Sequence, residues 1–231
     1  MSFNVKDTNE LKGVGPQQEV QFSLRVLADD AWVENIRVVG YSKEPVVSQG
    51  SDGVPELKPG ELWPDGELLA EDGRLIHFSD FRGQALAFNF FFSRCPLPNY
   101  CPLLNRNFAE ARKLLSSMSD NRTNYSFLSI SFDPEVDAPK NLAVYARTYR
   151  DDDARDWLFA AAPYKMLAAL PAQLGLIVKR QGANITHNLR TVVLDPQGRV
   201  YRQFDGNTWT AEELASAMKE ATQQGIKKGP Q

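Results

Sequence analysis

The feature that most constrains the fold is an uninterrupted apolar run, QALAFNFFF, at residues 84–92. A strand with one face in the core alternates apolar and polar residues, whereas a strand buried on both faces is apolar throughout. A second run of this kind, YSFLSISFD, follows at residues 125–133. Doubly buried strands are typical of a sheet covered by helices, so the chain is predicted to have an α/β core.

Helix and strand patterns alternate around these two runs. Pro102 suits the first turn of a helix, because the N–H that proline lacks would be unpaired there anyway. The apolar residues that follow it recur on one helical face, at Leu104, Phe108, Ala111, Leu115 and Met118. This order predicts a thioredoxin-like domain with a central mixed sheet flanked by helices. The other predicted elements are a hairpin turning at Asp72-Gly73, a helix over 139–150, a strand over 157–162, a helix over 164–175 that Pro171 interrupts or ends, a hairpin over 190–204 and a final helix opened by a capping box between Thr210 and Glu213.

The residues before this core form two parts. Apolar and polar residues alternate in two runs around Asp29-Asp30, which predicts a hairpin of amphipathic strands. Because two strands alone are marginally stable in water, this hairpin needs something to pack on. Residues 42–60 contain three prolines and three glycines without periodicity and are predicted to be a linker. The predicted division is a β segment at 1–41, a linker at 42–60, a thioredoxin-like domain at 61–226 and a tail at 227–231.

Composition excludes several classes of protein. A net charge of −3 argues against binding nucleic acid through phosphate neutralisation. No stretch approaches the roughly 18 apolar residues of a membrane span, and the N-terminus lacks the cationic-then-apolar pattern of a signal peptide. The chain contains only two cysteines, so a disulfide-rich scaffold is excluded and the pair is either incidental or functional.

Those two cysteines, Cys95 and Cys101, flank the loop that follows the buried strand. Ligands and reactive groups in open α/β sheets collect beyond the carboxyl ends of strands. Cys101 is expected at a helix N-terminus, and Arg94 places a cation beside Cys95. Both effects favour the thiolate, so at least one thiol is expected to have a depressed pKa. Two small structural cysteines are the alternative.

The chain has two histidines. His77 lies in the alternating run RLIHFSDF and is expected on a strand face, without a ligand role. His187, in NITHNLRTVVLD, immediately precedes a predicted strand. Two thiolates and one imidazole suit copper, particularly Cu(I). A structural zinc site usually takes four protein ligands, and a fourth is not apparent.

Three segments together resemble the SCO/SenC family of copper-binding, thioredoxin-fold proteins, from about residue 62 to about residue 223. They are DFRGQALAFNFFFSRCPLPNYCPLLNRNF, SFDPEVDAPKNLAVYA and ITHNLRTVVLDPQGRV. The resemblance implies that Cys95, Cys101 and His187 bind one copper ion and that Asp133 helps to tune the site. It implies a metallochaperone, not an enzyme, that assists assembly of the dinuclear copper centre of respiratory cytochrome oxidase. One departure is the five-residue spacer PLPNY, where the family usually has three residues between the cysteines.

The same resemblance implies partners and a location. The partners are cytochrome oxidase subunit II or another copper acceptor, and a protein that reduces the thiols. The location is the periplasm or the extracytoplasmic side of a membrane, although no signal peptide or membrane anchor is seen in these residues.

Two other functions remain open. A thiol–disulfide oxidoreductase would use Cys95 and Cys101 to reduce partner thiols. The segment Ile185-Thr186-His187-Asn188 has no proline where thioredoxin-type enzymes carry one facing the thiols, which favours metal binding. A copper sensor or redox-sensitive binding module is not distinguished from a chaperone by the sequence.

The N-terminal section carries a second resemblance. The stretch FNVKDTNELKGVGPQQEVQFSLRVLADDAWVENIRVVG, residues 3–40, is similar to the C-terminal half of a small CusF-like copper-binding β-barrel. The resemblance implies a truncated accessory domain that cannot bind copper by itself. Trp32 is then expected to be a packing residue, not a ligand.

Overall fold

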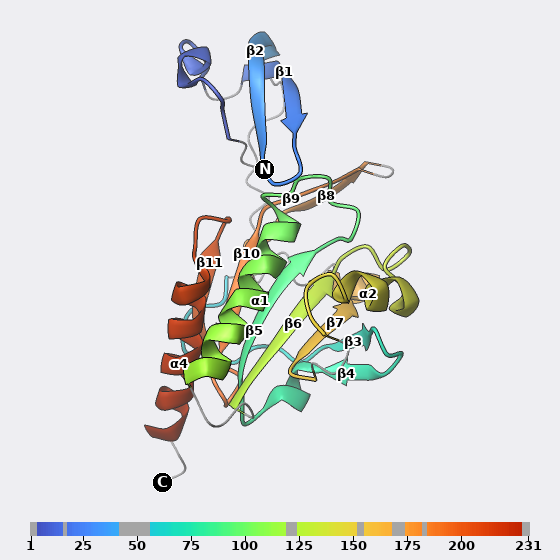
Figure 1. Cartoon of the computed structure of the whole chain (residues 1–231), viewed down its shortest axis with the longest axis vertical. Coiled ribbons are helices and arrows are strands. Elements are labelled where there is room, and N and C mark those ends of the chain that lie inside the picture. Colours follow the sequence, from blue (N-terminus) through green and yellow to red (C-terminus); the bar gives the residue numbers. More distant parts are fainter. Residues whose placement is uncertain are drawn as a thin grey trace.

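The structure, a computed structural model, describes residues 4–15, 18–41, 56–118, 124–151, 155–167, 174–181 and 184–227 (Figure 1). In these residues a seven-stranded mixed sheet forms the centre, in the order β11-β10-β5-β6-β7-β3-β4. Strands β5, β6 and β7 are parallel, and the others pair antiparallel, which confirms the predicted central mixed sheet. The bounds are β3 Glu67–Ala70, β4 Leu75–His77, β5 Ala85–Phe91, β6 Tyr125–Ser131, β7 Trp157–Ala161, β10 Arg190–Leu194 and β11 Val200–Asp205.

Strand β5 runs through the middle of the sheet, and all seven of its residues are buried, as its apolar run predicts. On one face Phe88 packs against Trp63 and Phe78, with ring centroids 4.8 and 5.2 Å apart. On the other face Asn89 lies at the base of α1 (Cys101–Met118), where its Nδ2 donates to Oδ1 of Asn105 at 3.1 Å. The strand therefore supports the core on both sides and ends at the thiol loop.

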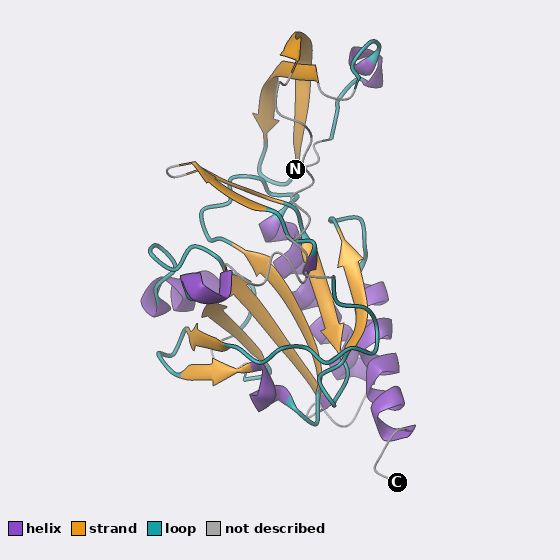
Figure 2. Cartoon of the chain, turned by 180° about the vertical axis from the view of Figure 1, so that it is seen from behind, coloured by secondary structure: helices purple, strands orange, loops and turns teal. Residues whose placement is uncertain are grey.

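The helices follow the predictions with differences at their ends. Helices α1 and α4 (Ala211–Lys227) pack together on one face of the sheet. In Figure 2, which views the molecule from the opposite side to Figure 1, the strands lie in front of these two helices. The predicted helix over 139–150 is shorter, because α2 (Pro139–Ala146) gives way to a turn. The capping box is present: the backbone N–H of Glu213 donates to Oγ1 of Thr210 at 3.2 Å, and that of Thr210 to Oε2 of Glu213 at 2.8 Å. Of the helix predicted over 164–175, residues 164–167 are helical, and residues 168–173 lie outside the described part of the chain.

Two hairpins stand apart from the main sheet. At the N-terminus β1 (Gln18–Val26) pairs antiparallel with β2 (Ala31–Tyr41), as the alternation predicts. The second hairpin, β8 (Val178–Gln181) with β9 (Asn184–His187), was not predicted. Short 3-10 segments complete the described elements at Thr8–Leu11 and Phe78–Phe81.

The predicted linker over 42–60 falls largely outside the described residues, and the domain boundaries remain predictions. Among the described helices, none has both the length and the apolar character required to cross a bilayer.

Replacing Phe88 by Ala removes a fully buried ring from the centre of this core. We expect Phe88→Ala to lower the free energy of unfolding by about 3–5 kcal/mol, through lost burial and the cavity left behind. Urea denaturation measures this loss. Val144→Ala, at a residue that is 59% exposed on α2, is the matched control and should change stability by less than about 0.5 kcal/mol. Equal effects at the two positions would contradict this description of the core.

Candidate metal centre

The two cysteines lie at the connection between β5 and α1. Cys101 is the first residue of α1 and is fully buried, whereas Cys95 lies in the preceding loop and is partly exposed. Pro102 therefore takes the second position of the helix, one residue later than predicted. Both thiols are free.

The five-residue spacer between the cysteines is held by hydrogen bonds to its backbone. The carbonyl of Leu97 accepts from the backbone N–H of Tyr100 at 3.0 Å, which closes a turn before α1. The carbonyl of Pro98 accepts from Arg106 at 2.8 Å, and that of Asn99 accepts from Nδ2 of Asn207 at 2.6 Å. Three successive carbonyls are thus satisfied, so the loop does not depend on solvent for its conformation.

The imidazole of His187 reaches the second thiol. His187 ends β9, and its Nε2 lies 3.5 Å from Sγ of Cys101, although the two residues are 86 positions apart. Nδ1 lies 2.8 Å from the carbonyl of Asn188. A carbonyl only accepts, so Nδ1 carries the proton and the lone pair of Nε2 faces the sulfur. The unpredicted β8–β9 hairpin is therefore the element that positions the imidazole.

The surroundings of His187 are apolar. The side chains of Phe92 and Phe132 meet the imidazole edge-on, with ring centroids at 5.8 and 4.6 Å. Burial lowers the pKa of His187 to about 4. The imidazole is consequently neutral at pH 7, the form in which histidine binds a metal.

The two thiols have opposite pKa shifts. The hydrogen bond from Cys101 lowers the pKa of Cys95 to about 7, whereas burial raises the pKa of Cys101. One depressed thiol was expected, but the cause differs from the prediction. The guanidinium of Arg94 pairs with Asp133 at 2.6 Å, and desolvation outweighs the position of Cys101 at a helix N-terminus.

Two buried carboxylates tie the loop to the turn after β6. Asp133 binds Arg94, the neighbour of Cys95, so its link to the thiols passes through that side chain. Asp137 accepts hydrogen bonds from the backbone N–H of Ser93 at 3.0 Å and from the hydroxyls of Ser93 and Ser131. Asp137 was not predicted from the sequence, where the one signal for it is its position at the end of DPEVD.

Other residues singled out from the sequence lie elsewhere. His77 ends β4, the outermost strand of the sheet, with its Nε2 3.9 Å from a carboxylate oxygen of Glu67. Nε1 of Trp32 donates to Glu34 at 3.1 Å, and the ammonium of Lys6 lies 5.1 Å from the centre of its ring. Such contacts suit a packing residue.

The donor set suits a soft cation, although it is not closed around one point. Within the described ranges, no three His, Cys, Asp or Glu side chains are already grouped so as to hold a metal ion. Cys101 contacts both of the other groups: its thiol is hydrogen-bonded to the sulfur of Cys95, and its Sγ lies 3.5 Å from Nε2 of His187. Coordination of one ion by all three would require their donor atoms to turn towards a common point beside Cys101. Two sulfurs and an imidazole nitrogen are ligands that Cu(I) accepts.

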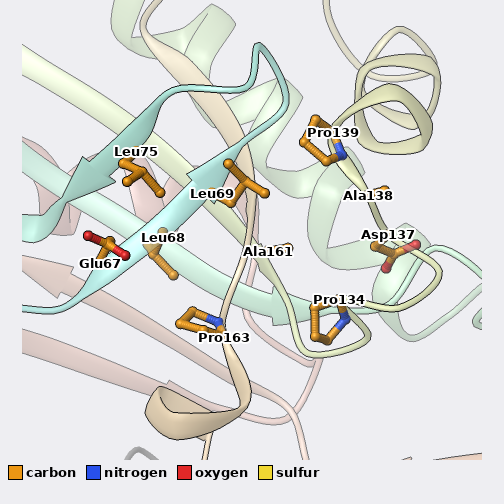
Figure 3. Close-up of a pocket in the computed structure, with 10 residues that line it drawn as sticks. All are labelled: Glu67, Leu68, Leu69, Leu75, Pro134, Asp137, Ala138, Pro139, Ala161 and Pro163. Carbon is orange, nitrogen blue, oxygen red and sulfur yellow. The ribbon is translucent and has the colours of Figure 1, made fainter.

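Two hollows lie near the candidate metal centre and the turn after β6. One of about 220 Å³ opens beside His187, between Tyr100 and Asn207. The other, of about 240 Å³, lies between β3 and the start of α2; neither thiol lines it (Figure 3). Its walls are mainly leucines and prolines, with Asp137 at one side. Of these two hollows, the first is lined by one candidate ligand, His187, and the second by none of the three.

Comparison with known proteins decides the family. The family model described as SCO1/SenC matches residues 58–223. The chain belongs to the SCO1/SenC family. A relative from Bacillus subtilis, a SCO1 protein homolog, is 24% identical over 156 residues, which cover 66% of this chain and 78% of the relative.

Solved structures of the family share the fold. The structure of Arabidopsis thaliana ScoI with copper bound superposes with a TM-score of 0.60 at 14% identity, over 71% of this chain and 99% of that one. The structure of BsSco, described as a Sco-family cytochrome c oxidase assembly protein with a disulfide switch, gives 0.60 at 21% identity, over 72% and 97%. The thioredoxin-like fold predicted from the sequence is therefore confirmed.

The unequal thiols give a prediction for the metal-free, reduced protein. Alkylation of Cys95 by iodoacetamide should rise with a midpoint near pH 7, while Cys101 should require a higher pH than its ordinary range. Peptide mass spectrometry follows each residue separately. In Cys101→Ala the hydrogen bond is lost, and the midpoint of Cys95 should move up towards about 8.5. A midpoint that is the same in both proteins would contradict the hydrogen bond as the cause.

The buried imidazole gives a prediction for stability. Between pH 6.5 and 4 the unfolded chain binds a proton at His187 that the folded protein excludes, because burial lowers the pKa to about 4. The contribution of His187 to the free energy of unfolding is therefore fully present above pH 6.5 and is lost as the pH falls. At pH 5 the loss is about 2 kcal/mol, at about 1.4 kcal/mol per pH unit. Urea denaturation of reduced, metal-free protein should show a smaller loss between pH 7 and pH 5 in His187→Gln, and equal losses would refute the assignment.

Proposed function

We propose that this protein is a copper-binding metallochaperone that holds Cu(I) through Cys95, Cys101 and His187 and delivers it to an acceptor protein. The observation that carries this proposal is the 3.5 Å contact between Sγ of Cys101 and Nε2 of His187. It brings an imidazole lone pair to one member of the thiol pair from a distant part of the sequence. The acceptor we infer is subunit II of cytochrome oxidase, at its dinuclear copper centre, or another copper-receiving protein.

The protonation states suggest an order of loading. Cys95 is partly exposed and about half ionised at pH 7, so it is the group that meets the incoming ion. His187 is neutral and offers Nε2 without losing a proton. Cys101 must release the proton that burial favours, and binding at this thiol therefore depends on pH. Transfer then proceeds by stepwise exchange of these ligands for those of the acceptor.

Membership of the family supports the proposal. One relative of the same fold is described with copper bound, and another is described as a cytochrome c oxidase assembly protein. We place the protein on the extracytoplasmic side of a membrane, where thiols oxidise readily and a separate reductant must keep the pair ready for metal.

A second candidate function is thiol–disulfide exchange, which the depressed pKa of Cys95 favours. The Cys95 thiolate would attack a partner's disulfide and form a mixed disulfide, releasing one partner thiolate that takes up a proton. Cys101, after losing its proton, would attack Cys95 and release the second partner thiol. The partner is then reduced by two electrons and the pair is oxidised to a disulfide, which a thiol reductant must reset.

Anaerobic titration with Cu(I) of the reduced protein tests the leading proposal. We expect one equivalent to bind tightly, measured by competition with a chromogenic Cu(I) chelator. His187→Ala should weaken the affinity for Cu(I) by at least about tenfold. Loss of a group that only supports a metal ligand typically weakens metal binding about 10–100-fold, and loss of the ligand itself should cost at least the lower of these values. His77→Ala removes the other imidazole, away from the thiols, and should bind as the parent does.

The outcome separates the two functions. Equal affinity of the parent and His187→Ala would remove the imidazole from the ligand set and shift support to the oxidoreductase. Catalysis of insulin reduction, abolished in Cys95→Ser, would then establish thiol exchange. Failure of both assays would refute both functions.

A further inference from the structure

The hollow between β3 and the start of α2 combines apolar walls with charge of one sign. Its volume is about 240 Å³. Among the ten described residues that line it, eight are leucine, proline or alanine, and the other two are Glu67 and Asp137. In Figure 3 these two acidic residues lie on opposite sides of the hollow, with Leu69 and Ala161 between them. The lining that the structure describes thus carries negative charge and no positive charge.

Glu67 is the exposed one of the two acidic residues. Its side chain is 54% exposed, and Nε2 of His77 lies 3.9 Å from one of its carboxylate oxygens. That separation is too long for a hydrogen bond. Leu75, which is 59% exposed on β4, adds apolar surface to the same wall of the hollow. A group that enters the hollow therefore meets an exposed leucine and an exposed carboxylate.

Asp137 is the buried one and has hydrogen bonds in place of a counter-ion. Its side chain accepts from the backbone N–H of Ser93 at 3.0 Å and from the hydroxyls of Ser93 and Ser131. Within the described ranges, no lysine or arginine forms an ion pair with Asp137. Because charges interact more strongly away from water, a cation placed in the hollow would stabilise this carboxylate.

The size of the hollow and the state of Asp137 select the kind of cation. Pockets for whole small molecules usually measure about 300–1,000 Å³, so a hollow of about 240 Å³ suits a single side chain. Lysine lays an apolar four-carbon stem along apolar surface and keeps its charge at the tip. Arginine is favoured where its planar fork meets two open carboxylate oxygens, but Asp137 is fully buried and already accepts three hydrogen bonds. The compact charge of lysine is therefore the better match.

We propose that this hollow is a docking site for a lysine side chain of a partner protein. The stem of the lysine lies against Leu69 and Leu75, and its ammonium group is held by the charges of Glu67 and Asp137. None of the candidate copper ligands lines the hollow. The site goes beyond the proposed copper function and does not depend on it.

The hollow is linked to the thiol loop through Asp137. The backbone N–H that Asp137 accepts belongs to Ser93, two residues before Cys95. A partner whose lysine occupies the hollow is therefore held beside the turn that supports this loop. The amide of Ser93 also reports on occupancy, because a cation near Asp137 changes the charge that this N–H faces.

Titration with n-butylammonium chloride, which reproduces the lysine side chain, tests the site in the full-length, reduced, metal-free protein. NMR should show saturable shifts of the methyl signals of Leu69 and Leu75 and of the amide signal of Ser93. The Kd should lie in the millimolar range, as for other very small ligands. 1-Butanol has the same stem without the charge and should bind at least about fivefold more weakly. A peptide, acetyl-Gly-Lys-Gly-amide, should shift the same signals, and its norleucine counterpart should bind as weakly as butanol.

Variants assign the charges. Glu67→Gln should weaken the binding of butylammonium about two- to fivefold, the range for one exposed ion pair. Glu135→Gln removes an exposed acid of the turn after β6 that does not line the hollow, and it should bind as the parent does. Asp137→Asn should also weaken binding, and circular dichroism establishes that its fold is kept. Because Glu67 is exposed, Glu67→Gln remains a valid test even if Asp137→Asn does not fold.

Several results would overturn the proposal. They are the absence of saturable shifts with butylammonium, equal binding of butylammonium and butanol, and equal binding by the parent and Glu67→Gln. Binding of butylammonium without binding of the lysine peptide would make the hollow a site for a small free amine, and would overturn the docking of a partner's side chain.

Discussion

The contact between Cys101 and His187 depends on the exclusion of water from both side chains. Each is at most 1% exposed, and burial acts on them in opposite senses: it keeps the thiol protonated and the imidazole deprotonated. Both groups are therefore neutral at pH 7, and neither is buried as an unpaired charge. Negative charge is left to Cys95, the one group of the three that reaches solvent. In the metal-free centre the negative charge therefore lies on the solvent-exposed side, at Cys95.

The neighbouring charges are arranged so that they do not disturb this distribution. Arg94 would stabilise a thiolate at Cys95 if its guanidinium were free, but Asp133 binds it at 2.6 Å. Asp137, also buried, is satisfied by Ser93 and Ser131. These bonds connect the start of the thiol loop to the turn after β6, and they neutralise or solvate both carboxylates within the protein. They hold the loop in place while leaving the hydrogen bond between the two sulfurs as the main cause of the low pKa of Cys95.

The sequence predicted those features that depend on patterns of apolar residues. The continuous run at 84–92 gave β5, and the helical spacing from Leu104 gave α1, so the thiols were placed correctly at the junction of the two. The β8–β9 hairpin was missed because VKRQ and NITH are mostly polar and show no clear alternation. Only the family resemblance led to His187, since spacing cannot reveal a contact across 86 positions. That Arg94 pairs with Asp133 and not with the thiolate of Cys95 depends on side-chain geometry, which the sequence likewise could not predict.

The two unusual parts of the sequence, the five-residue spacer and the N-terminal hairpin, contact each other. Leu97 and Tyr100 of the spacer are buried, which leaves Asn99 to donate its side chain to the carbonyl of Ala31. Ala31 is itself only 3% exposed and belongs to the same apolar core as Leu97 and Tyr100. The backbone of Asn99 is held from the other side by Asn207, at the turn before α4. A change in the thiol loop that moves Asn99 would therefore disturb two hydrogen bonds, one to the N-terminal hairpin and one to the turn before α4.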